Sequence, residues 1–225
     1  MKEGFHLVAG NLALDFANTL DNRYDPERLV DLLSTYERFL GFATQSGIIT
    51  QQQVGKLLRE IRPRDTDGTL ERVIELRETL YFLFKSVATG KPPDPSRLQT
   101  FNRFLADGHV PEAIIWHKPD FIRVYRDLTE TPEGPLWPVV EAAGSLLTSP
   151  DRHHVRECIE GTCRWLFLDR SKNHSRRWCD MKVCGNRSKA QRFYARSRSA
   201  SRTKTQPQSK QTMKPVLQTK RGHSK

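Results

Sequence analysis

Apolar residues recur at steps of three and four along most of the first 150 positions, a pattern typical of amphipathic helices. The first such stretch runs over residues 25–47. Asp25 and Pro26 suit the N-cap and the first helical position, and Gly47 suits the C-terminal cap. The apolar positions between them share one helix face, so the sequence predicts a long amphipathic helix here.

Two further helices are expected next. Thr50 and Gln53 have the spacing of a capping box, which predicts a helix that ends at Pro63. Residues 64–68 are polar and indicate a turn, after which the apolar stripe of residues 73–87 predicts a third helix. Glutamates and arginines alternate along that helix, which favours ion pairs on a solvated face.

Shorter elements follow. Asp94 and Pro95 predict the start of a fourth helix, and residues 113–125 have the composition of a β-hairpin that we expect to cover one side of the helical core. A last helix over residues 138–147 precedes the expected domain boundary at residues 149–151. The fold class is therefore mainly α with a small β-hairpin, an α+β domain.

Polar side chains gather near the N-terminus. Residues 6–14 fit either a short strand or the start of a helix, and Asp15, Asn18 and Thr19 are the polar residues that follow. If these three side chains face inward, they form a hydrogen-bonded anchor or line a pocket that binds a small ligand. If they lie in a turn, they bond to the nearby backbone. The sequence leaves both interpretations open.

All four cysteines of the chain lie close together as two C-x4-C pairs separated by fifteen residues: Cys158, Cys163, Cys179 and Cys184. Zn²⁺ takes four such ligands in a tetrahedron, and two short loops can each present two thiolates to it. Two disulfides or unpaired buried thiols are the alternatives. Charged residues interrupt the N-terminal apolar stretch, so no signal peptide is expected, and disulfides are rare in a reducing cytoplasm. The spacing therefore predicts a zinc site in a cytoplasmic protein.

The segment between the cysteine pairs is expected to form a hairpin, with strands at residues 165–168 and 176–178. From Gly185 onward the pattern becomes helical. The result would be a treble-clef-like finger, or a ribbon of two metal-binding turns. Three histidines lie near enough in sequence to replace a ligand, although four cysteines already complete the shell: His153, His154 and His174.

The segments RWCDM at residues 177–181 and CGNR at residues 184–187 resemble the CGNR zinc finger, a bacterial domain. In that family the finger follows an N-terminal domain called ABATE, and the whole is regarded as a stress-induced transcription regulator. Residues 11–19 resemble the opening of that domain, although Ala17 replaces a larger aliphatic residue. The resemblance covers about residues 5–197. It implies an ABATE-like domain over residues 1–150 and a finger over residues 151–197.

Charge divides the chain in the same way. The net charge is +11, but residues 1–150 carry 17 Lys and Arg against 21 Asp and Glu, whereas residues 151–225 carry 20 against 5. The concentration of positive charge in residues 151–225 indicates that the partner is a nucleic acid or an anionic membrane surface. No apolar run is long enough to span a membrane. Residues 198–225 are basic and polar without acidic residues, so we expect a disordered tail.

The basic residues of the finger are candidates for contact with nucleic acid. Lys and Arg neutralise phosphates, and Arg and Asn can also pair with base edges. A solvated helix face is the plain alternative. Ala190 and Phe193 of the same helix are expected to pack inward. The candidate contacts are Arg176, Arg177, Asn186, Arg187, Lys189, Arg192 and Arg196.

The resulting hypothesis is a transcription regulator that binds duplex DNA through a zinc-stabilised finger. Its helical domain would sense a small-molecule effector or form a homodimer. The alternatives are an RNA-binding or ribosome-associated zinc protein and an enzyme acting in the N-terminal domain. The enzyme is the weaker of these, because the sequence has no P-loop, nucleophile elbow or dinucleotide fingerprint.

Overall fold

The computed structural model describes residues 4–60, 63–108, 112–125 and 127–203. These residues fall into two units, Met1–Asn186 and Arg187–Lys225. The first unit contains the helical domain and the cysteine-rich segment, and the second contains helix α7 (Asn186–Thr203) except for its first residue. No helix of the described segments is long and apolar enough to cross a membrane.

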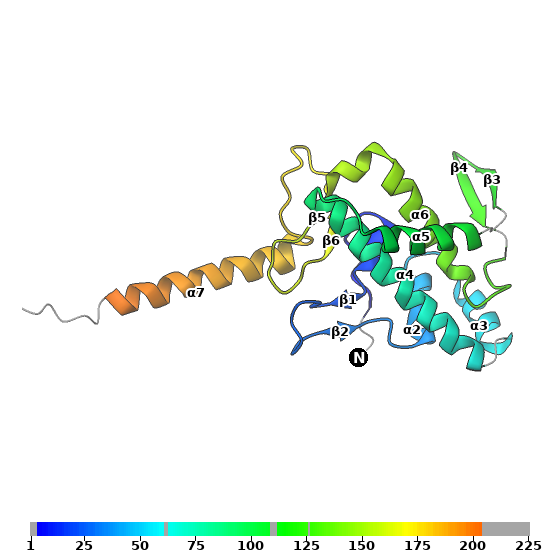
Figure 1. The fold of residues 1–225 in the computed structure, drawn as a ribbon, viewed down its shortest axis with the longest axis horizontal. Coiled ribbons are helices and arrows are strands. Elements are labelled where there is room, and N and C mark those ends of the chain that lie inside the picture. Colours follow the sequence, from blue (N-terminus) through cyan, green and yellow to red (C-terminus); the bar gives the residue numbers. More distant parts are fainter. Residues whose placement is uncertain (1–3, 61–62, 109–111, 126, 204–225) are drawn as a thin grey trace, which may run out of the picture. The chain divides into compact units, whose positions relative to one another are not determined.

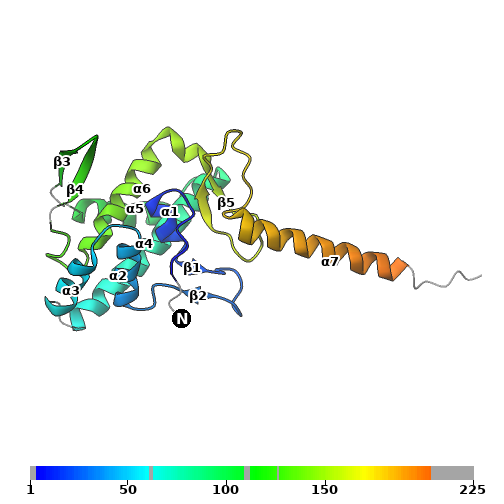
Figure 2. The same ribbon diagram turned by 180° about the vertical axis from the view of Figure 1, so that it is seen from behind.

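Helix α1 (Leu12–Ala17) lies at the centre of the first unit (Figures 1 and 2). Its N-cap is Asn11, whose side chain accepts a hydrogen bond from Ala13 N at 2.9 Å, so the opening motif forms a helix and not a strand. Helices α4 (Pro63–Thr89) and α6 (Trp137–Thr148) and strand β6 (Leu166–Leu168) all contact it. Four of its six residues are buried: Ala13, Leu14, Phe16 and Ala17.

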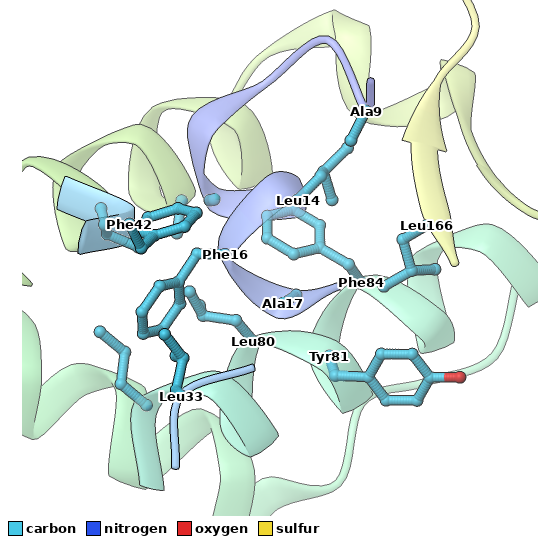
Figure 3. Packing of buried hydrophobic residues seen from close by; sticks show 14 of the residues in the cluster. Ala9, Leu14, Phe16, Ala17, Leu33, Phe42, Leu80, Tyr81, Phe84 and Leu166 are labelled. Atoms are coloured by element: carbon cyan, nitrogen blue, oxygen red, sulfur yellow. The ribbon is translucent and has the colours of Figure 1, made fainter. Parts of the chain in front are cut away.

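Helix α4 supplies the apolar stripe that α1 packs against. Leu80 and Phe84 are fully buried beside Leu14 and Phe16, and Leu166 of β6 lies next to Phe84 (Figure 3). The stripe was predicted, but the turn expected at residues 64–68 was wrong, because that segment belongs to α4. The preceding helix α3 (Gln51–Glu60) ends before Pro63, as predicted, and Pro63 is the first residue of α4, a position at which proline is compatible with a helix.

The predicted start of helix α2 was wrong, whereas the predicted start of helix α3 was confirmed. Helix α2 (Tyr36–Gln45) begins at an N-cap, Thr35, and not at residue 25. The chain before it turns and forms a two-residue ladder between β1 (Leu20–Asp21) and β2 (Val30–Asp31). Helix α3 (Gln51–Glu60) has the predicted capping box: Gln53 Oε1 accepts from Thr50 N at 2.8 Å, and Thr50 Oγ1 accepts from Gln53 N at 3.3 Å.

Helix α5 (Pro95–Asp107) begins as predicted, with Asp94 accepting a hydrogen bond from Ser96 N at 2.8 Å. The hairpin of β3 (Glu112–His117) and β4 (Asp120–Tyr125) was also predicted, but its expected packing was wrong. None of its described side chains belongs to the hydrophobic core, and Ile114 and Phe121 are 67% and 74% exposed. The 3₁₀ turn η1 (Gly134–Leu136) then leads into α6.

The cysteine-rich segment follows η2 (Pro150–His154) and shares the core of the helical domain. Strand β5 (Val155–Glu157) pairs antiparallel with β6, and Leu166 and Phe167 are buried in the same cluster as the helices. The strand expected at residues 176–178 was wrong. Both carboxylate oxygens of buried Asp169 instead accept backbone N–H groups, from Ser171 and Arg176, which shapes a loop there.

The segment ends in the π-helical turn η3 (Met181–Gly185), after which the predicted helix α7 begins. Helix α7 runs to Thr203, past residue 198, where the disordered tail was expected to start. The rest of that tail, residues 204–225, lies outside the described residues.

Candidate metal centre and basic helix

The four cysteine sulfurs form one buried cluster in which all Sγ atoms lie within 4.8 Å of one another. Two of the separations are 3.5 Å, between Cys163 and Cys179, and 3.6 Å, between Cys179 and Cys184. A tetrahedral zinc site with bonds of about 2.3 Å places its sulfurs about 3.8 Å apart. All four cysteines are free thiols, which disagrees with the disulfide alternative. Donor type, number and spacing therefore fit a single zinc ion.

A buried carboxylate shapes the first cysteine loop. Glu160 Oε2 accepts hydrogen bonds from Cys163 N at 3.0 Å, Thr162 N at 3.2 Å and Thr162 Oγ1 at 2.8 Å. At the neck of the loop, Cys158 N donates to Trp165 O at 2.7 Å. The backbone between Cys158 and Cys163 is thus held by protein contacts alone.

A second carboxylate has the same role in the other loop. Asp180 Oδ1 accepts from Lys182 N at 2.6 Å and from Val183 N at 3.3 Å. A Cβ atom at Gly185 would lie 2.3 Å from Met181 Sδ, so a larger residue there would require the exposed Met181 side chain to move. Sequence reasoning missed both carboxylates. Their signal is a Glu or Asp one or two positions after the first cysteine of each pair.

Hydrogen bonds among the four thiols shift their pKa values in opposite directions. The contacts of Cys158, with Cys163 first, hold its pKa well below the usual range, while the same pair contact raises the pKa of Cys163. The pKa of Cys184 is lowered as well, and thiols that lose their protons readily suit a cation.

The three predicted ligand-binding residues near the N-terminus instead make contacts within the fold. Asn18 Nδ2 donates to Leu166 O and Asn18 Oδ1 accepts from Leu166 N, both at 2.8 Å. Thr19 Oγ1 donates to Phe16 O at 2.7 Å. Both side chains are buried, so their hydrogen-bonding groups serve the fold.

Asp15 holds the N-terminal segment, which in turn bonds to strand β6. Its Oδ1 accepts from Ala9 N at 2.9 Å, and Ala9 O accepts from Leu168 N at 2.8 Å. Burial raises the pKa of Asp15 to about 6, although hydrogen bonds from the Ala9 and Val8 backbone oppose this shift.

A second polar cluster escaped sequence reasoning altogether. The buried Tyr81 hydroxyl lies 3.4 Å from each of Tyr24 Oη, Glu157 Oε1 and Arg164 O. Burial, followed by the hydrogen bond with Tyr24, raises the pKa of Tyr81. The Arg23 guanidinium lies over the Tyr81 ring, 3.9 Å from its centre. These residues are too far apart in sequence for any local pattern to connect them.

A surface groove of about 560 Å³ lies elsewhere in the first unit. Its apolar residues include Leu12 and Leu128, and its polar residues include Gln53, Glu141 and Ser145. None of the three predicted ligand-binding residues lines it. Its volume is in the range of small-molecule sites.

Two of the predicted nucleic-acid contacts bond to the backbone of the second cysteine loop. Arg176 donates to Trp178 O at 2.9 Å and to Cys179 O, with its guanidinium 4.6 Å from the centre of the Phe167 ring. Asn186 Nδ2 donates to Lys182 O at 2.9 Å. These two side chains therefore brace the second cysteine loop.

The other predicted contacts present charge at the surface. Arg177 is exposed, with its guanidinium 5.5 Å from the centre of the Trp178 ring. On α7, Lys189, Arg192 and Arg196 are exposed and Arg187 is half-buried. Phe193 was expected to pack inward, and this was wrong, because it is 67% exposed.

A helical domain that shares its core with a four-thiol centre, followed by a basic helix, defines a zinc-finger protein. The CGNR zinc finger family matches residues 154–197. The ABATE family, described as "Putative stress-induced transcription regulator", matches residues 10–150, and the chain belongs to this family. The match to the zinc finger and the cysteine cluster together identify Zn²⁺ as the metal that the protein binds. A comparison with curated proteins found no match.

Proposed function

We propose that this protein is a transcription regulator that binds duplex DNA through a zinc-stabilised basic finger. Residues 1–150 form its regulatory domain, residues 151–197 its finger and residues 198–225 a basic tail. The observation that supports this most is the position of a helix with no acidic residue directly after a four-thiol cluster. Neither family described above is an enzyme family by its description.

The proposed zinc ligands are Cys158, Cys163, Cys179 and Cys184. When bound, the ion cross-links the two cysteine loops, which the chain already shapes through Glu160 and Asp180. Metal binding then fixes the backbone of η3, from which α7 begins. The role of the metal is therefore to order the start of the DNA-binding helix.

Contact with DNA is assigned to Arg177 and to the cations of α7: Arg187, Lys189, Arg192 and Arg196. Each phosphate contact displaces condensed counterions, so binding weakens steeply as salt rises. Arg176 and Asn186 act indirectly in this proposal, because their side chains bond within the cysteine-rich segment.

Binding is tested with the full-length, zinc-loaded protein by fluorescence anisotropy on a duplex at several salt concentrations. We expect one zinc per chain by elemental analysis, a steep salt dependence, and loss of both zinc and DNA binding in Cys179→Ser. The matched control is Ser188→Ala, which removes a polar side chain outside the metal cluster. Equal DNA binding by the zinc-free variant would disprove the role of the metal. A marked preference for single-stranded RNA at the same salt would favour the RNA-binding alternative.

The helical domain is proposed to sense a small effector in the groove near Gln53 and Glu141. The support is its volume and mixed lining. A thermal-shift screen of metabolites should find a compound that raises the melting temperature of the wild type but not of Ala142→Leu, which narrows the groove. If no compound stabilises the wild type, the domain is structural and not a sensor.

A further inference from the structure

Helix α7 exposes two large aromatic side chains on an otherwise polar surface. Phe193 and Tyr194 are both 67% exposed, and their ring centres lie 5.9 Å apart. Every residue from Lys189 to Ser197 is exposed. Two adjacent exposed rings offer apolar surface that a bound molecule would bury.

Phe193 lies on one face of α7 together with three cations. Lys189, Arg192, Phe193 and Arg196 are spaced at i, i+3, i+4 and i+7, which places them along a single helix face. They line a shared hollow of about 270 Å³. Tyr194 lies one position further round the helix and does not line this hollow.

The charge of this face selects the kind of partner. Residues 186–203 contain six Lys and Arg and no Asp or Glu. Arg192 and Arg196 are four apart on the helix, a spacing at which like charges destabilise it. Phosphates on either side of the phenyl ring would remove this repulsion, whereas another copy of the same helix would increase it.

We propose that Phe193 is a base-contacting residue, with Lys189, Arg192 and Arg196 contacting the phosphates that flank it. This rests on the proposed function. An α-helix fits the major groove of duplex DNA, where the thymine methyl group is the apolar feature that a phenyl ring can contact. The cations fix the position of the helix on the backbone, and Phe193 contributes preference for sequence.

The experiment compares full-length, zinc-loaded variants on two duplexes of equal length, one with A·T and G·C pairs and one with G·C pairs only. Phe193→Ala should weaken binding to the first duplex about 10-fold, the loss expected from exposing most of a buried phenyl ring, and should change the second less than about 2-fold. Its salt slope should match that of the wild type. Arg192→Gln should lower the slope by about 0.9 on both duplexes.

Tyr194→Ala is the matched control, because it removes an equally exposed ring from outside the shared face. It should change affinity for either duplex less than about 2-fold. Equal affinities of Phe193→Ala and wild type for the A·T-containing duplex would overturn this inference and leave the proposed function intact. If Phe193→Ala converts a dimer into a monomer by light scattering, the ring contacts a second copy and the inference is also overturned. A wild type that binds no duplex would overturn both.

Discussion

The side-chain amide of Asn18 and the backbone of Leu166 bond to each other twice, each time at 2.8 Å, across 148 positions of the chain. The amide thereby acts as one more strand residue beside β6. Because Asn18 is the C-cap of α1, this pair connects the centre of the helical domain to the strand between the cysteine loops. The two family regions are therefore joined by a buried polar contact as well as by a shared core.

Replacing Asn18 should destabilise the whole first unit. Asn18→Ala leaves the buried N–H and C=O groups of Leu166 without partners, and each such loss costs about 1–3 kcal/mol. We expect the free energy of unfolding of the zinc-loaded protein to fall by about 3 kcal/mol in urea denaturation. Asn173→Ala, in an exposed loop, should change it by less than about 0.5 kcal/mol. Similar values for the two variants would show that the Asn18 pair contributes little.

Glu160 should determine how tightly zinc is held. Glu160→Ala removes the acceptor for the N–H groups of Thr162 and Cys163, so the first cysteine loop loses its shape before metal binding. Groups that orient metal ligands typically affect affinity 10- to 100-fold, and we expect about 10-fold here. Competition against a chromophoric chelator measures this change. Glu160→Gln keeps an acceptor oxygen and should lose less, so an equal loss in both variants would contradict the orienting role.

Asp15 should make stability depend on pH in an unusual direction. Its pKa is about 6 in the folded protein and 3.8 without burial. Between these values the folded state holds more protons than the unfolded state, so the stability from this group is full below about pH 4 and is lost as pH rises to about 6. Asp15→Asn, which can still accept from Ala9 N, should therefore be more stable than wild type above pH 6.

The expected gain for Asp15→Asn is about 1–2 kcal/mol at pH 7, reduced from the full linkage value because the carboxyl group is partly exposed. Urea denaturation of both proteins from pH 4 to pH 8 provides the comparison. The difference between them should grow from pH 4 to pH 6 and stay constant above. A constant difference over the whole range would show that Asp15 does not titrate there.

Arg77 should contribute far more to the free energy of unfolding than Arg72, an exposed charge on the same helix. It is 3% exposed, and its guanidinium donates twice to Asp31, at 2.6 and 3.0 Å, and once to Glu78 at 3.0 Å. Arg77→Met leaves both carboxylates without this partner and should lower the free energy of unfolding by about 2–3 kcal/mol, since both are partly solvated. Arg72→Met, which breaks an exposed pair with Asp107, should cost about 1 kcal/mol or less.

Local patterns predicted the elements whose ends are fixed by neighbouring residues. The capping box at Thr50 and the Asp94 N-cap both formed, because their hydrogen bonds span only two or three positions. The helix expected from Asp25 failed for the opposite reason. Asp31 bonds to Arg77, 46 positions away, and Leu32 N donates to Thr19 O, so distant contacts hold this segment in a turn and a short ladder.

The cysteine spacing, the basic finger and the apolar stripe of α4 were properties of the sequence alone, since metal chemistry, charge and helical periodicity depend on residue type and local order. Only the tertiary structure decided the roles of Asn18, Arg77 and Phe193. Whether a side chain is buried, paired or exposed depends on which distant backbone lies beside it, and no local pattern encodes that neighbour.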